Sequence, residues 1–173
     1  MNIAEIAYTA GFFDGEGTIT LSLTPPLKSG GVSYQLSIAI SNTNLPVLLK
    51  CRDIWQVGTV KSVSVKPPRR PQWVWQVKAN QAVYILKTIL PYLQIKKSEA
   101  EIAIIFQEHK QHAKKVWGKY KPMAHFKREA DLAELLLNER RVKVSNLDTE
   151  LDNILKTNQL PFIYEEGYYE RTA

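Results

Sequence analysis

The chain has 173 residues, of which 45% are hydrophobic and 23% charged, a composition that excludes a disordered chain and allows one domain with a substantial core. Its longest apolar runs are too short to span a bilayer, and we expect neither a secretion signal nor membrane association. The single cysteine, Cys51, excludes an intramolecular disulfide, and its apolar surroundings predict buried packing rather than catalysis.

The net charge of +6 is unevenly distributed along the chain. Between Gly17 and Ser98 there are eleven lysines and arginines and one acid, Asp53, whereas twelve basic residues face thirteen acids after Ser98. A positive potential concentrated in the first half predicts that a polyanion binds there, although a solvated basic face is the simpler alternative.

The spacing of apolar residues predicts a helix over residues 2–13, followed by Asp14-Gly-Glu-Gly17. Two acids at the C-terminal end of a helix oppose its dipole and need compensation, for which a divalent cation is a candidate. Small residues recur every four positions at Ala7, Gly11 and Gly15, which predicts a flat seam where a second helix can approach closely.

Two alternating segments come next. Residues 18–24 place Ile19, Leu21 and Leu23 on one side and hydroxyl residues on the other. Residues 33–41 alternate in the same way, and a flexible connection at residues 28–31 joins them into a predicted hairpin.

Asn44 and Pro46 predict the start of a helix that runs to about Trp55 and ends before Gly58. A second hairpin is predicted from residues 59–66 and 72–78, around a proline-rich loop at residues 67–71.

The phase of this second hairpin is harder to assign, because Val60 and Val63 are out of phase and allow a bulge. We favour Trp73, Trp75 and Val77 facing inward; the opposite phase would place two indoles on the ligand face.

Further helices are predicted over residues 80–93, with a break near Pro91, and over residues 96–115, 124–141 and 147–156. The order αββαββα predicts an α+β fold, in which helices cover one face of a four-stranded antiparallel sheet. We expect one domain over residues 1–173, with a core at about 1–115 and a helical C-terminal extension at about 116–173.

The outer face of this sheet would carry hydroxyls, amides and cations, which suit hydrogen bonds to base edges and phosphates in double-stranded DNA. A polar solvent face is the alternative, but the scarcity of acids argues against it. The candidate DNA-binding residues are Thr20, Ser22, Thr24, Lys28, Ser33, Gln35, Ser37, Lys61, Lys66, Arg69, Arg70, Gln72, Gln76 and Lys78.

The segment Thr9-Ala-Gly-Phe-Phe-Asp-Gly-Glu-Gly17 resembles the LAGLIDADG motif of homing endonucleases, and the order of elements over roughly residues 1–115 is similar to that family. The resemblance implies a saddle-shaped sheet that lies on DNA. A single motif implies a homodimer, paired through the motif helices, and a target with approximate two-fold symmetry. The expected interface residues are Ala7, Ala10, Gly11, Asp14 and Gly15.

The resemblance also implies the catalytic residues. The second acid of the motif, Glu16, would hold the metal ions, and Asp14 would have a structural role. Asn42 would order active-site water, with Asn44 as the alternative. Residues 91–97, Pro-Tyr-Leu-Gln-Ile-Lys-Lys, resemble the segment that supplies a family lysine, here Lys96. A surface lysine at a helix start is the simpler interpretation of that residue.

The expected function is therefore a site-specific, metal-dependent endonuclease that cuts both strands and leaves 3′ overhangs, intron-encoded, and acting in a prokaryotic cytoplasm or an organelle. Mg²⁺ is the expected cofactor, Mn²⁺ a substitute and Ca²⁺ an ion that supports binding without cleavage; no organic cofactor is expected.

Two alternatives remain. One is a non-cleaving LAGLIDADG protein, either an RNA maturase or a DNA-binding regulator. The other, a structural RNA-binding protein, leaves the small-residue seam unexplained. A zinc site at His109, His112 and His125 is disfavoured, because no cysteine lies nearby.

Overall fold

The computed structural model describes residues 1–24, 33–64, 68, 70–117 and 123–141. The predicted order of elements is confirmed. The elements are α1 (Ile3–Glu16), β1 (Gly17–Thr24), β2 (Ser33–Asn42), α2 (Leu45–Trp55), β3 (Thr59–Val63), β4 (Gln72–Lys78), α3 (Ala79–Ile89), the 3-10 turn η1 (Leu90–Tyr92), α4 (Lys97–Trp117) and α5 (Met123–Arg141).

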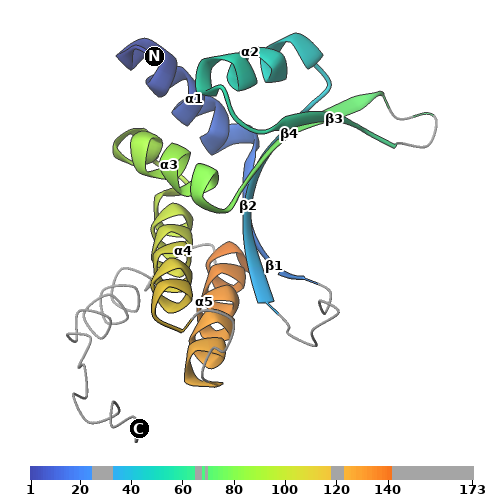
Figure 1. The fold of residues 1–173 in the computed structure, drawn as a ribbon. Coiled ribbons are helices and arrows are strands. Elements are labelled where there is room, and N and C mark those ends of the chain that lie inside the picture. The colour runs from blue at the N-terminus through green and yellow to red at the C-terminus, as the bar shows by residue number, and fades with distance from the viewer. Residues whose placement is uncertain (25–32, 65–67, 69, 118–122, 142–173) are drawn as a thin grey trace, which may run out of the picture. The chain divides into compact units, whose positions relative to one another are not determined.

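The four strands form one antiparallel sheet in the order β1-β2-β4-β3. Figure 1 shows this sheet strongly curved, with the helices gathered on one side of it. The α+β fold that the sequence predicts is therefore confirmed. None of the described helices combines the length and the apolar character that a membrane-spanning segment requires.

The inward face of the sheet packs against the helices, as the alternation of the strands predicts. Ile38 and Ile40 of β2 lie opposite Val77 and Trp75 of β4, and all four are at most 1% exposed. The favoured phase of the second hairpin is thus confirmed. Cys51 is also fully buried, and this burial raises the pKa of its thiol to about 11.

No bulge interrupts the pairing of β3 with β4, which runs in step from Thr59 opposite Gln76 to Val63 opposite Gln72. The valine pattern has a simpler cause. Val60 faces inward with Trp75, whereas Val63 takes the outer face and is 37% exposed.

Helix α1 is longer than the sequence predicted, since it ends at Glu16 and not at Phe13. Its start is fixed by a capping box: the Asn2 side chain accepts from the Glu5 N–H at 2.9 Å, and the Glu5 carboxylate accepts from the Asn2 N–H at 2.8 Å. The helix continues past Phe13 because the Asp14 carboxylate accepts hydrogen bonds from residues outside the helix.

Helix α1 passes into strand β1 without a loop. At Gly17, an added Cβ would lie 2.4 Å from the Phe13 carbonyl oxygen and 2.5 Å from its ring, which leaves no space for a side chain. Glycine therefore allows the helix to meet the strand directly.

Several features predicted from the sequence lie outside the described residues. They are the helix over residues 147–156, the connection at residues 28–31 and the candidate cations Lys28, Lys66 and Arg69.

Candidate nucleic-acid interface

The C-terminal end of α1 is held by the segment that precedes α4. The Asp14 carboxylate accepts hydrogen bonds from the backbone N–H groups of Gln94, at 2.6 Å, and Lys96, at 3.0 Å. The Lys96 ammonium donates to the main-chain carbonyl of Asp14. A cation thus lies beside Asp14 at the negative end of the α1 dipole, where a positive charge is favourable.

Glu16, the last residue of α1, is exposed, and its carboxylate makes no hydrogen bond or ion pair with any residue that the structure describes. No group of three or more His, Cys, Asp or Glu side chains in the described part of the chain could hold a metal ion. At this end of α1 the described residues therefore offer one exposed carboxylate without a partner. Such a donor fits Mg²⁺, which usually takes one or two carboxylates and completes its shell with water and phosphate oxygens.

The two candidate asparagines have different surroundings. Asn44 caps α2, since its side-chain oxygen accepts from the Val47 N–H at 3.3 Å. Asn42 ends β2, and its side-chain oxygen accepts from the Asn44 N–H at 2.8 Å. The amide nitrogen of Asn42 has no hydrogen-bond partner among the described residues, so it has donors to offer.

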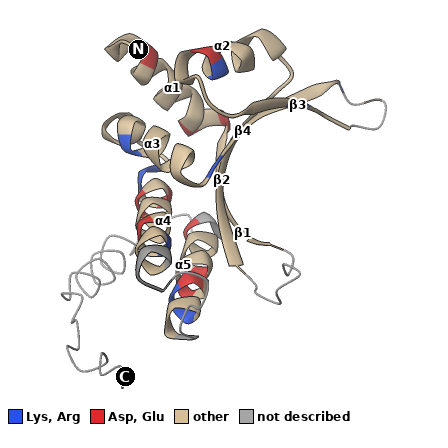
Figure 2. Ribbon diagram, viewed as in Figure 1, with Lys and Arg blue, Asp and Glu red and all other residues tan. Residues whose placement is uncertain are grey.

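The register of the strands brings most of the candidate DNA-binding side chains together on the outer face. Thr20 lies opposite Ser37, Ser37 opposite Lys78, and Ser22 opposite Gln35. Gln72, Gln76 and Lys61 continue this face across β4 and β3. The strands contain no acidic residue, and Figure 2 shows the described acids confined to the helices.

Exposure varies over this face. Lys61, Lys78 and Ser22 are exposed, and Arg70, two residues before β4, is exposed as well. Ser37 is only 9% exposed because it lies between its neighbours in the middle of the sheet.

The hydroxyl groups of Thr24 and Ser33 make hydrogen bonds within the chain. The Thr24 hydroxyl donates to the Ser33 carbonyl at 2.6 Å, and the Ser33 hydroxyl donates to the Tyr34 carbonyl at 3.3 Å. The Thr24 bond thus crosses the base of the first hairpin, whereas the Ser33 bond is local, and both hydroxyl protons are used within the chain.

The small-residue seam of α1 faces outward. Ala7, Gly11 and Gly15 are exposed, and a Cβ built at either glycine would meet nothing within 4 Å. Ala10 and Asp14, which we also assigned to a dimer interface, are instead 0% and 7% exposed, because their side of α1 packs into the chain's own core.

The histidines of α4 and α5 pair with each other. His109 and His125 stack with ring centroids 4.8 Å apart, and His125 Nδ1 lies 3.2 Å from His109 Nε2. Burial, reinforced by the charges of Arg128 and His125, lowers the pKa of His109 to about 4.

Sequence reasoning did not single out Lys110, on α4. Its ammonium donates to the Ser33 hydroxyl at 2.9 Å and to the Tyr34 carbonyl at the start of β2. Nothing in the sequence distinguishes this lysine from those on the solvent side of a helix, because its partners lie more than seventy residues away.

Comparison with protein families gives one match, in which the model of the LAGLIDADG endonuclease family covers residues 9–118. No curated protein matches the chain.

Several solved structures share this fold. The homing endonuclease I-CvuI in complex with its target is 19% identical, with a TM-score of 0.65, over 90% of this chain and 97% of that one. The archaeal intron-encoded homing endonuclease I-Vdi141I, complexed with DNA, is 18% identical with a TM-score of 0.66 and the same coverage. Meganuclease I-SmaMI, bound to uncleavable DNA, is 16% identical with a TM-score of 0.59, and the match covers 77% of this chain and 45% of that one.

Proposed function

Because this chain belongs to the LAGLIDADG endonuclease family, we propose that it is a homing endonuclease that binds double-stranded DNA as a homodimer and hydrolyses both strands. The observation that best supports the proposal is the position of Glu16. Its free carboxylate ends α1, and the next residue begins the sheet whose outer face carries polar and basic side chains but no acid. A reactive carboxylate thus adjoins a surface suited to DNA.

In this proposal the outer face of the sheet enters the major groove. Gln35, Gln72 and Gln76 offer both donors and acceptors to base edges, while Lys61 and Lys78 neutralise phosphates or bind guanine. That similar folds have been solved in complexes with DNA supports this mode of binding.

The homodimer would form through the exposed seam of Ala7, Gly11 and Gly15, because the absence of side chains at the two glycines lets a second backbone approach. Two copies of Glu16 would then converge near the two-fold axis. A two-fold assembly requires a target of approximate two-fold symmetry.

Bound Mg²⁺ would supply a polarised water as nucleophile and positive charge near the leaving 3′ oxygen. The chain's own residues have three tasks. Glu16 would hold the cation, the Asn42 amide would donate to a water molecule and orient it, and Lys96 would contribute positive charge. Cutting both strands would leave 3′ overhangs.

Cleavage of a plasmid that carries a target selected from a randomised duplex library tests the proposal. We expect linear product in Mg²⁺ and binding without cleavage in Ca²⁺. Binding without any nick in Mg²⁺ or Mn²⁺ would favour the non-cleaving alternative, a DNA-binding regulator or an RNA maturase. Failure to select any duplex would contradict the proposed function as a whole.

A further inference from the structure

The first four residues of strand β2 have a neighbour on one side only among the described strands. Strand β1 pairs with β2 from Ser33 to Ile40, but β4 pairs with it only from Ser37 to Asn42. The segment from Ser33 to Leu36 therefore has an edge along which no described strand lies. Gln35, a candidate base-reading residue, belongs to this segment, and its direction depends on what holds that edge.

Helix α4 contacts this edge through Lys110. The ammonium group donates to the Tyr34 carbonyl and, at 2.9 Å, to the Ser33 hydroxyl. It also lies 5.9 Å from the centre of the Phe106 ring, which is fully buried. Two hydrogen bonds and a cation–π contact hold the lysine in one position.

The neighbouring turn of α4 holds the end of β4 in the same way. Gln107 and Gln111 both donate to the Asn80 side-chain oxygen, at 2.8 and 2.6 Å. Asn80 follows Ala79, whose φ of 51° turns the chain sharply out of β4. One polar face of α4 thus fixes the ends of both central strands.

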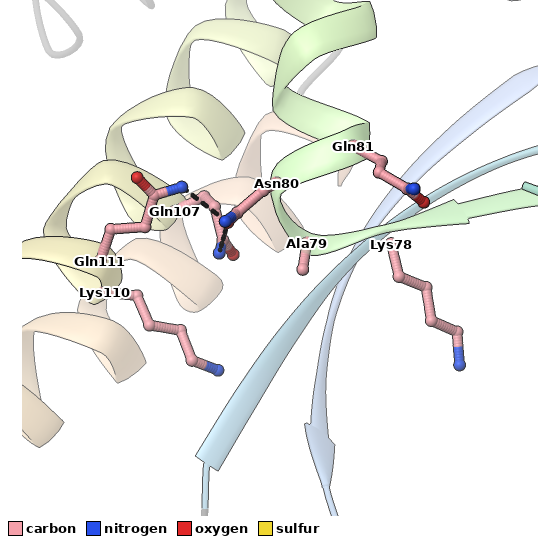
Figure 3. A pocket seen from close by; sticks show the side chains of 7 residues that line it. All are labelled: Lys78, Ala79, Asn80, Gln81, Gln107, Lys110 and Gln111. Carbon is pink, nitrogen blue, oxygen red and sulfur yellow. Dashed lines mark hydrogen bonds between the residues drawn. The ribbon is translucent and has the colours of Figure 1, made fainter. Parts of the chain in front are cut away.

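A cavity of about 430 Å³ lies beside these contacts. Figure 3 shows the two hydrogen bonds to the Asn80 side chain, and the Lys110 side chain, along its wall. The cavity is lined by Lys78, Ala79, Asn80, Gln81, Gln107, Lys110 and Gln111.

From this geometry we infer that Lys110 is a positioning residue for base recognition: it fixes the start of β2 and so the direction in which Gln35 meets the DNA. The inference rests on the proposed binding of DNA by the outer face. The ammonium is directed to a main-chain carbonyl of its own chain, so its effect is on orientation and not on phosphate charge.

The test compares target profiles obtained by selection from a randomised duplex library. Gln35→Ala identifies the base pairs read near Ser33–Leu36, and Gln76→Ala identifies those read by β4. For Lys110→Met we expect discrimination between bases to fall about three- to tenfold at the base pairs that Gln35→Ala identifies, which is a part of what a base contact contributes. Discrimination at the base pairs that Gln76→Ala identifies, and the salt dependence of binding, should not change.

Lys87→Met is the matched control, because Lys87 lies on α3, is exposed and pairs with Glu108 of α4 at 2.5 Å. It should leave the whole profile unchanged. Lys110→Arg, which keeps the charge and the donors, should restore most of the discrimination. Lys110→Gln, a shorter and neutral side chain, should lower discrimination as Lys110→Met does, so it provides the test if the methionine variant folds poorly.

An unchanged profile for Lys110→Met and for Lys110→Gln, together with a normal wild-type profile, would overturn the positioning role alone. A lower salt slope for Lys110→Met would also overturn it and would make Lys110 a phosphate contact. If wild-type protein selects no duplex, the proposed function fails, and the positioning role fails with it.

Discussion

The Lys96 ammonium donates a hydrogen bond to the main-chain carbonyl of Asp14, two residues before Glu16. The same lysine donates its backbone N–H to the Asp14 carboxylate at 3.0 Å. The positive charge that the sequence analysis expected for the active site is therefore attached to the end of the motif helix itself.

Lys96→Met should slow the chemical step more than it weakens binding, because charge that develops in the transition state would lose a nearby cation. The measurement is a single-turnover rate at saturating enzyme, with the Kd for DNA determined separately in Ca²⁺. Weaker binding with an unchanged rate would make Lys96 a residue that positions the phosphate.

Glu16→Gln should abolish cleavage but leave folding, dimerisation and DNA binding in Ca²⁺ intact. The carboxylate is exposed and has no described partner, so the substitution removes a charge and breaks no contact. Plasmid cleavage and a mobility shift in Ca²⁺ decide the matter. A variant that cuts at nearly the wild-type rate would refute the catalytic assignment.

Gly11→Leu should break the dimer while the chain still folds. A Cβ added at this exposed position would meet nothing within 4 Å in its own chain, so a loss of association would come from the approach of a second copy. Light scattering reports the oligomeric state, and circular dichroism reports the fold. Asp131→Leu, at an exposed position on α5, is the control; a Gly11→Leu dimer of normal stability would place the interface elsewhere.

Lys61→Ala and Arg70→Ala should each weaken DNA binding, because both side chains are exposed on or beside the outer face of the second hairpin. A lost phosphate contact lowers the salt slope by about 1, and a lost base contact costs about 1–3 kcal/mol at one symmetric position. Arg52→Ala serves as control, since Arg52 lies on α2 and pairs with Asp53 at 2.7 Å. Unchanged affinity, slope and profile in both test variants would exclude this hairpin from the interface.

Stability should fall as the pH decreases from about 6.5 to about 4. The unfolded chain protonates a histidine near pH 6.5, whereas the folded chain protonates His109 only near pH 4, so in this window the unfolded state binds more protons. Thermal melting measures the effect. His109→Leu should flatten the dependence, while His112→Gln, on the same helix, should keep it; equal slopes in all three proteins would contradict the assignment.

The alternation of apolar and polar residues predicted correctly which face of strands β1, β2 and β4 packs against the helices. The alternation in residues 72–78 placed Trp75 and Val77 inward, and the register with β2 confirms it, because a sheet with one buried face admits a single phase. The candidate residues of β1, β2 and β4 were likewise gathered on one face by alternation alone.

The sequence could not reveal contacts between distant segments. Asp14 and Glu16 suggested a helix that ends at Phe13, since nothing nearby in sequence compensates them; the donors come from Gln94 and Lys96, some eighty residues later. The burial of Ala10 depended in the same way on how α1 rotates against the sheet.

The direct passage from α1 into β1 has a consequence for altering the target of the proposed nuclease. Glu16 and Gly17 are consecutive, so no loop separates the proposed catalytic carboxylate from the proposed recognition surface. Replacing outward side chains would therefore retarget the protein while the stagger between the two cuts stays constant. Changing that stagger would require residues inserted at the junction itself, where Gly17 has no space for a side chain.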